Sequence, residues 1–190
     1  AVEASGFIPL QHRWTLLKPL VKDPSASVRY AVASQLAGYA QHVEGDDYIV
    51  LSALFREYEQ QLLLSQDMPA GQASMAIYAL DQGDAEGALS ALNKALEIEP
   101  DFAPALLNLA DLYRSMGDEV KTKETLARAI KVAPDSAAIQ HSYGLYWVRQ
   151  KKMFESLPYL RAATEQEDRA ARYFYVYAVA LENSGNLNEA

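Results

Sequence analysis

The sequence repeats with a period of 34 residues, and this repeat constrains the fold more than any other feature. When Pro100 is superposed on Pro134, the neighbouring rows align without a gap. The residues that recur at this spacing are a glycine, an alanine and a proline: Gly83 and Gly117; Ala95, Ala129 and Ala163; Pro100 and Pro134. A fixed period of this length is typical of stacked structural repeats, each of which contacts its neighbours.

Each repeat has the pattern of two helices. In the second repeat, four apolar residues follow the i, i+3, i+4, i+7 spacing of one helix face: Leu106, Leu109, Ala110 and Tyr113. Gly117 suits the left-handed residue after a helix end, and Asp118 suits the next N-cap. A second helix follows over about 119–132 and ends before Pro134, which cannot continue a helix. We expect two helices to approach closely at Ala95, Ala129 and Ala163.

The repeat resembles the tetratricopeptide repeat (TPR). The family pattern is matched in the second repeat by Ala110, Tyr113, Gly117, Ala129 and Pro134. The resemblance implies an all-α fold, a right-handed superhelical solenoid of antiparallel helix hairpins with about 10–11 helices. We predict a TPR array over 69–190, with repeats at 69–102, 103–136 and 137–170 and a partial repeat at 171–190.

The third repeat departs from the family pattern. Lys151 stands where the turn glycine is expected, and Pro158 falls within the second helix. Because proline is tolerated in a first turn, we expect this helix to start near Phe154 or Glu155. Four aromatic residues take inter-helix packing positions of the family and are expected in the core: Tyr143, Trp147, Phe174 and Tyr177.

The first 66 residues do not follow the 34-residue period. Residues 1–45 resemble a HEAT-like helical hairpin, in which Asp23 and Arg29 flank the turn. Residues 46–68 are predicted to form a capping helix or half-repeat, with a helix over about 48–65. Asp46 and Asp47 suit the positive end of that helix.

This order of segments resembles the C-terminal region of bacterial multihaem c-type cytochromes that carry TPRs. In that family the haems sit on Cys-x-x-Cys-His motifs upstream, which implies export to the periplasm. The chain contains no cysteine, so we expect no cofactor in this segment. We also expect the sequence to be an internal segment of a longer chain. The alternative is a free-standing TPR adaptor unrelated to redox chemistry, in which case a cytoplasmic location is open.

Charge and hydropathy exclude several classes of partner. The formal net charge is −8. Residues 1–66 carry 5 Lys/Arg against 7 Asp/Glu, and residues 67–190 carry 12 against 18. Neither part offers the positive field that nucleic acid or an anionic membrane requires. The longest apolar runs, YIVLSALF and FYVYAVAL, are far shorter than the roughly 20 residues of a membrane span.

No catalytic or metal-binding pattern stands out. His12, His42 and His141 have no ligand partner at helical spacing. The carboxylates of Asp46–Asp47 and of 165–168 fall at expected helix ends, where solvated carboxylates are common. We therefore predict a segment that is not an enzyme.

The TPR resemblance places nine residues on the concave groove, where a protein or peptide segment would bind. These are Ile77, Leu107, Asp111, Arg114, His141, Leu145, Arg149, Tyr175 and Val179. The lysine and asparagine with which some TPR domains hold a terminal carboxylate are missing, since Asp111 takes one of those positions. The partner could be another protein or the chain's own upstream haem domain.

The last predicted helix, over about 171–183, would expose Tyr177, Ala178 and Leu181 once its packing partner is removed. We expect self-association through this helix.

Overall fold

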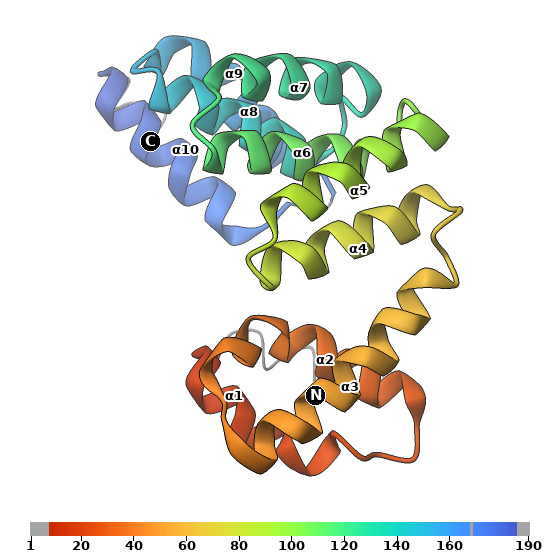
Figure 1. Cartoon of the computed structure of the whole chain (residues 1–190). Coiled ribbons are helices and arrows are strands. Elements are labelled where there is room, and N and C mark those ends of the chain that lie inside the picture. Colours follow the sequence, from red (N-terminus) through yellow and green to blue (C-terminus); the bar gives the residue numbers. More distant parts are fainter. Residues whose placement is uncertain (1–7, 168, 186–190) are drawn as a thin grey trace. The chain divides into compact units, whose positions relative to one another are not determined.

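The computed structural model is helical throughout the residues that it describes, 8–167 and 169–185 (Figure 1). These residues form ten α-helices and two short 3-10 helices, with no strand among them. The predicted all-α fold of antiparallel helix hairpins is confirmed. The chain divides into two compact units, Ala1–Ile98 and Glu99–Ala190.

The N-terminal unit contains α1 (Leu10–Leu17), α2 (Ala26–Leu36), α3 (Gly45–Leu63), α4 (Pro69–Asp81) and α5 (Ala85–Ile98). The 3-10 helices η2 (Lys18–Leu20) and η3 (Ala37–His42) follow α1 and α2. Helix α3 begins three residues before the predicted range and ends two residues short of it. Its first turn carries Asp46 and Asp47, as the sequence predicted.

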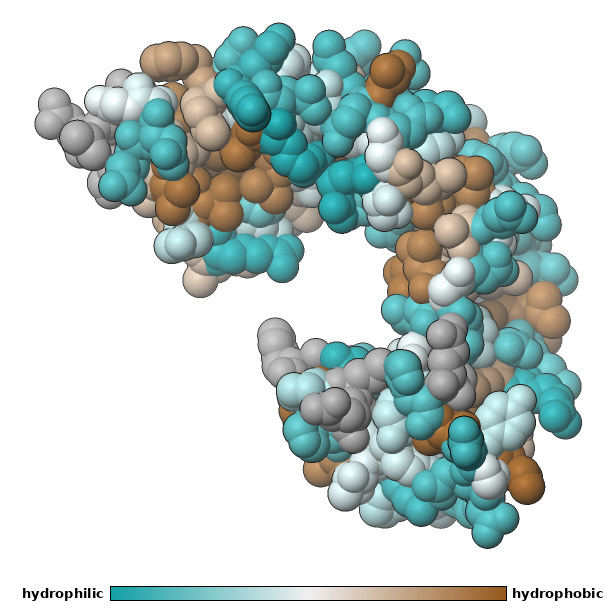
Figure 2. All heavy atoms as spheres, turned by 60° about the vertical axis from the view of Figure 1, so that its left-hand side comes forward, coloured by the Kyte–Doolittle hydropathy of each residue, from teal (hydrophilic) through white to brown (hydrophobic). Residues whose placement is uncertain are grey.

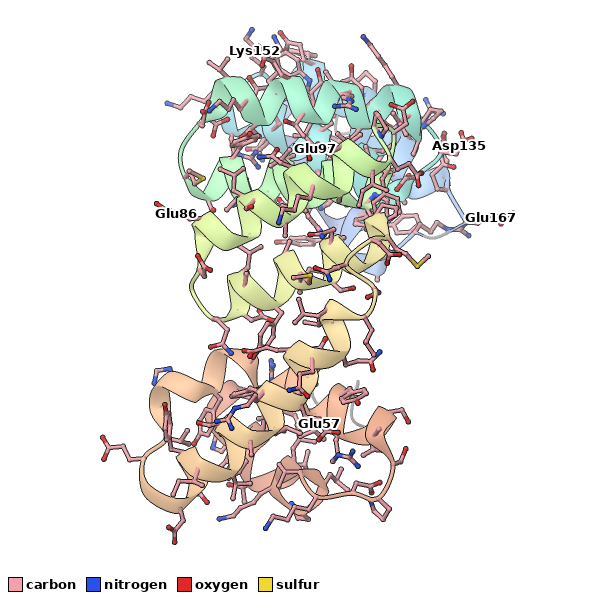
Figure 3. The ribbon with its side chains drawn as sticks, turned by 45° about the vertical axis from the view of Figure 1, so that its right-hand side comes forward. Glu57, Glu86, Glu97, Asp135, Lys152 and Glu167 are labelled. Atoms are coloured by element: carbon pink, nitrogen blue, oxygen red, sulfur yellow. The ribbon has the colours of Figure 1, made fainter. Side chains whose placement is uncertain are left out.

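Long-range polar bonds tie α1 and α2 to α3 around an apolar core. The indole Nε1 of Trp14 donates to Asp47 Oδ2 at 2.8 Å. The guanidinium of Arg29 donates to both carboxylate oxygens of Glu57, at 3.0 and 2.5 Å, and to the carbonyl of Asp23 at 2.7 Å. Glu57 lies on α3 (Figure 3). The two pairs therefore connect elements that the sequence separates by 33 and 28 residues.

The C-terminal unit consists of five consecutive antiparallel helices. They are α6 (Ala103–Ser115), α7 (Glu119–Val132), α8 (Ala137–Arg149), α9 (Met153–Glu165) and α10 (Ala171–Ser184), and each packs against the next (Figure 1). A left-handed residue follows α6, α8 and α10: Gly117 at φ 77°, Lys151 at φ 59° and Gly185 at φ 82°. Lysine therefore takes the backbone conformation that glycine takes elsewhere in the unit.

Small residues allow the helices of the C-terminal unit to approach closely. Ala129 and Ala163 are fully buried, as predicted. Gly144 lies so close to α9 that an added Cβ would stand 2.6 Å from Leu160 Cδ2. A side chain at Gly144 is therefore excluded unless Leu160 moves.

Two sequence predictions about α9 and α10 need correction. Helix α9 begins at Met153, two residues after the left-handed Lys151, so Pro158 is its sixth residue and lies beyond the first turn. The carbonyl that loses its partner there belongs to the first turn, at exposed Phe154. In α10 the buried aromatic residue is Tyr173, which packs with Ala137 and Ala163, whereas Phe174 is 49% exposed.

The helices of each hairpin fall within the predicted repeat limits, whose boundaries remain a prediction. The carboxylate Asp168 and residues 186–190 of the predicted partial repeat lie outside the described residues, as do residues 1–7 of the predicted HEAT-like hairpin.

Candidate functional site

The C-terminal unit holds a cavity of about 300 Å³ between α6, α7 and α8. Its lining residues are Ala110, Asp111, Arg114, Thr122, Leu126, Ser142, Leu145 and Arg149. We call this cavity the α6–α8 groove. It brings together four of the nine predicted groove residues, Asp111 and Arg114 of α6 and Leu145 and Arg149 of α8, because both helices border the cavity.

Two arginines give the α6–α8 groove its charge. Arg114 Nε lies 3.3 Å from Asp111 Oδ1 on the same helix. Arg149 Nε lies 4.0 Å from Glu119 Oε1, at the limit of an ion pair. Burial lowers the pKa of Arg149 from its usual value, Glu119 opposes that effect, and the positive charge of Arg114 reinforces it. The guanidinium of Arg149 is thus partly desolvated and weakly paired.

Glu119, at the start of α7, holds the end of α8. Its Oε2 accepts a hydrogen bond from Gln150 Nε2 at 3.0 Å, while its Oε1 faces Arg149. The sequence reasoning missed Glu119. It also missed Thr122, whose repeat position is taken by Ala88 and Ser156 in the neighbouring repeats. All three residues at that position are buried, and this recurrence of small side chains could have indicated a close approach.

Four further predicted groove residues lie elsewhere. Leu107 is partly buried against the core cluster of Ala110 and Leu126. Ile77 belongs to the N-terminal unit, where it lines a separate hollow. Tyr175 and Val179 lie on α10, 72% and 37% exposed. In Figure 2, brown hydrophobic side chains gather on the C-terminal unit in the upper left of the view.

His141 is the predicted groove residue that the structure places in the core. It is 7% exposed, its ring centroid lies 4.4 Å from that of Tyr173, and its Nδ1 is buried without a hydrogen-bond partner among the described residues. Burial, and secondarily the nearby charge of Arg172, lowers its pKa to about 4. Because α10 covers it, His141 is not accessible to a partner in this structure.

The basic residues around the α8–α9 turn separate into two environments. Arg149 faces the α6–α8 groove, whereas Lys152 Nζ lies 5.3 Å from the centroid of the Trp147 ring. Lys123 of α7 lies over the same ring at 5.3 Å. Figure 3 shows Lys152 at the outer edge of the C-terminal unit. Arg149 and Lys152 therefore face different surroundings, although both lie next to this turn.

Neither a metal site nor a membrane span occurs within the described ranges. No three His, Asp or Glu side chains among residues 8–167 and 169–185 are grouped so that they could hold a metal ion. None of the helices described is both long and apolar enough to cross a membrane.

Comparison with known families identifies the repeat. The tetratricopeptide repeat model matches residues 79–144, a range that contains the α6–α7 hairpin and most of α8. A tetratricopeptide repeat domain is therefore supported. The TPR hairpin also explains why the α6–α8 groove is lined mainly by α6 and α8, the first helices of successive repeats.

Solved TPR structures have the same fold at low sequence identity. A thermophilic TPR protein of Thermus thermophilus, TTC0263, superposes with a TM-score of 0.62 at 18% identity, covering 91% of this chain and 89% of that one. MamA from Desulfovibrio magneticus RS-1 superposes with a TM-score of 0.55 at 12% identity, covering 95% and 88%. At these identities the likeness concerns the fold alone.

Curated relatives include the aspartyl/asparaginyl beta-hydroxylases. The human protein is 23% identical over 138 residues, which cover 68% of this chain and 18% of the hydroxylase. The mouse protein is 25% identical over 107 residues, covering 55% and 14%. The chain thus spans less than a fifth of the length of these relatives.

Proposed function

We propose that this segment is a non-catalytic protein-interaction scaffold that binds a peptide or protein segment in the α6–α8 groove. The observation that supports it is the convergence of Asp111, Arg114, Leu145 and Arg149 on one cavity in a TPR domain. Leu145 supplies apolar contact, and the charged side chains set the orientation of the bound segment. The exposed Tyr175 and Val179 of α10, together with Leu107 and Ile77, are proposed to extend the contact surface.

Site-specific photocrosslinking tests the groove. We place a photoreactive phenylalanine at Leu145 in the full-length protein and, as the control, at Val120, which is 68% exposed and lines a different hollow. We expect one discrete adduct from Leu145 and none from Val120. The substitution Arg149→Glu should remove that adduct, whereas Lys131→Glu should leave it. Equal adducts from both positions would contradict the groove assignment.

We further propose that the segment is the non-haem assembly arm of an exported, periplasmic bacterial multihaem cytochrome. This proposal rests on the resemblance of a HEAT-like hairpin followed by TPRs. The 190 residues contain no cysteine, so they cannot attach a c-type haem covalently. Any haem would be carried upstream, and that haem domain is then a candidate occupant of the groove.

The alternative proposal is a free-standing TPR adaptor, for which a cytoplasmic location is open. An absorption spectrum with intact mass of the full-length protein from its native host separates the two. A Soret band with the added mass of covalent haem supports the cytochrome arm, and an unmodified mass supports the adaptor.

Self-association through α10 is a separate proposal. Leu181, which the sequence predicted to be exposed, is 1% exposed and lies in the core. Phe174 and Tyr175 are 49% and 72% exposed on that helix, and exposed aromatic patches favour association. Sedimentation of the 190-residue chain should show dimers that Tyr175→Glu abolishes. A monomer at high concentration would contradict this proposal.

A further inference from the structure

A second groove lies on the N-terminal unit, apart from the α6–α8 groove. It consists of two hollows, of about 460 and 280 Å³, that share Glu59, Tyr78, Ala79 and Asp84 as lining residues. Along α3 the lining runs from Tyr48 to Leu63. We call the joined hollows the α3–α4 groove.

One face of α3 forms the floor of this groove. Tyr48, Ser52, Phe55, Glu59, Leu62 and Leu63 line it, and their spacing of three and four residues places them on one side of the helix. At the rise of an α-helix, the stretch from Tyr48 to Leu63 gives the groove a length of about 22 Å. Tyr48 and Leu63, near its two ends, are 53% and 47% exposed.

Tyr78 of α4 lies between the two hollows and fixes the distance between α3 and α4. Its ring meets those of Tyr58 and Phe55 at centroid distances of 5.3 and 6.3 Å, and its hydroxyl donates to Glu59 Oε1 at 3.1 Å. Tyr78 is 9% exposed. This buried side chain lines both hollows at the place where they meet.

The centre of the groove is acidic. Its end at Leu62 and Leu63 is apolar, whereas its other end combines the rings of Tyr48 and Phe55 with polar side chains. Each hollow is lined by Glu59 and Asp84, and the side chains of these two residues are exposed. Glu59 Oε1 accepts from Tyr78, and Asp84 Oδ1 accepts from the amide of Gly87 at 2.8 Å. Arg56 is the single cation among the lining residues.

Gly87 leaves the space that the Asp84 carboxylate occupies. A Cβ at position 87 would collide with Asp84 Oδ2, so any larger residue there would push this carboxylate out of its position. Both Gly87 and Asp84 line the smaller hollow.

We propose that the α3–α4 groove binds an amphipathic helix of another protein in which two large aliphatic residues flank a lysine or arginine. Phe55 in the larger hollow and Leu62 in the smaller one are seven residues apart on α3, a rise of about 11 Å, which matches side chains at i and i+7 of a bound helix. A basic residue at i+4 falls on the same face and meets Glu59 and Asp84. Charge complementarity thus selects the partner's central residue, and the two hollows select its flanking residues.

The probe is a dye-labelled peptide of about fifteen residues with leucines at i and i+7 and an arginine at i+4, long enough to form a helix. Fluorescence anisotropy measures its binding to the 190-residue chain, alongside the same peptide with glutamate at i+4. We expect the arginine peptide to bind at least about tenfold more tightly, with an advantage that falls as salt is raised.

Variants locate the binding. Leu63→Glu should abolish it, whereas Leu64→Glu, the adjacent residue, which is 78% exposed and does not line the groove, should leave it unchanged. Glu59→Arg should reverse the preference so that the glutamate peptide binds more tightly. Leu145→Asp and Ile77→Glu should have no effect, which separates this groove from the α6–α8 groove.

Several outcomes would overturn the proposal. They are the absence of binding to the unaltered chain, equal binding of both peptides, and loss of binding with Leu64→Glu or Leu145→Asp as well as with Leu63→Glu. Concentration-dependent dimers that Leu63→Glu dissolves would assign the groove to a second copy of this chain instead.

Discussion

The two units fix their helices in different ways. In the N-terminal unit, α1 and α2 are bonded to α3 through Trp14–Asp47 and Arg29–Glu57, which are directional side-chain contacts. In the C-terminal unit, neighbouring helices approach through buried Ala129, Ala163 and Gly144. Helices α1–α3 depend on side chains that reach each other, whereas the C-terminal unit depends on side chains that are small or absent. The two units should therefore respond to different substitutions and to different pH ranges.

The largest effect is expected from filling the closest approach in the C-terminal unit. Gly144→Val forces a side chain against Leu160, and overpacking of this kind should lower the free energy of unfolding by about 3 kcal/mol. Urea denaturation measures the loss, and hydrogen exchange should place it in α8 and α9. Adding Leu160→Ala to this variant should recover part of the stability, since the two sites are in contact. Additive losses would show that the contact at Gly144 is not tight.

The second prediction concerns moderate acid and the C-terminal unit. The pKa of His141 is lowered to about 4 from 6.5, so between these values the unfolded chain takes up a proton that the folded chain does not. Stability is present above pH 6.5 and is lost as pH falls, by about 2 kcal/mol between pH 7 and pH 5. Thermal unfolding across this range measures the loss.

His141→Leu is the matched variant for that experiment. It keeps an apolar side chain beside Tyr173 and removes the titrating group, so the dependence between about pH 7 and pH 5 should become flat. A slope that persists in this variant would assign the acid sensitivity to another group.

The third prediction concerns stronger acid and the N-terminal unit. The hydrogen bond from Arg29 is the main cause that lowers the pKa of Glu57, against a smaller opposing effect of burial. The stability from this pair is therefore present above the usual value of 4.5 and is lost as pH falls through the lowered pKa. Arg29→Met should reduce the unfolding temperature at neutral pH by a few degrees and weaken the loss in stronger acid.

Arg56→Met is the control for the pair. Arg56 precedes Glu57 on α3, is exposed, and forms no ion pair with the described residues. The substitution Arg56→Met should change neither the unfolding temperature nor its dependence on pH. Together, the two acid experiments predict that the C-terminal unit weakens first as pH falls, and hydrogen exchange at about pH 5 would contradict this if α2 and α3 exchanged before α8.

The smallest effect is expected at Lys151, the one non-glycine residue with a left-handed backbone conformation among the described residues. Lys151 has φ 59°, a conformation that costs an ordinary residue roughly 1 kcal/mol. Lys151→Gly removes that strain, but glycine has more freedom in the unfolded chain, so the net gain should be about 0.5 kcal/mol. The reverse change, Gly117→Lys, should cost a similar amount by urea denaturation. A loss on Lys151→Gly would indicate that the lysine side chain itself stabilises the turn.

The comparison also separates what the sequence could and could not predict. The helices of the C-terminal unit were predictable because glycine, alanine and proline recur at a fixed spacing, and the buried Ala129 and Ala163 confirmed that spacing. The face that α10 buries was not predictable from the sequence. The helix buries Tyr173 and not Phe174 because Tyr173 packs against Ala137 and Ala163 of other helices.

The side-chain pairs of the N-terminal unit could not be predicted from the sequence at all. Nothing in the sequence around Trp14 or Arg29 names Asp47 or Glu57 as the partner, since these pairs depend on how three helices pack.

The α6–α8 groove contains both residues that the sequence predicted and residues that it did not. The repeat positions predicted Asp111, Arg114, Leu145 and Arg149, and the cavity brings these four together. The burial of His141 depends on its cover by α10, and the role of Glu119 depends on its distance from the end of α8. Both follow from packing between helices, which the spacing of residues along one helix does not encode.

The left-handed residue between the helices of each hairpin has a further consequence. The geometry of the turn depends on that residue and not on the helices beside it, so the positions of Gly117 and Lys151, 34 residues apart, are structurally equivalent. Recombination between the coding sequences at these two positions would remove or add one complete repeat and leave every remaining turn intact. The length of such a binding surface is thus open to change in whole repeats during evolution, without any new fold having to be invented.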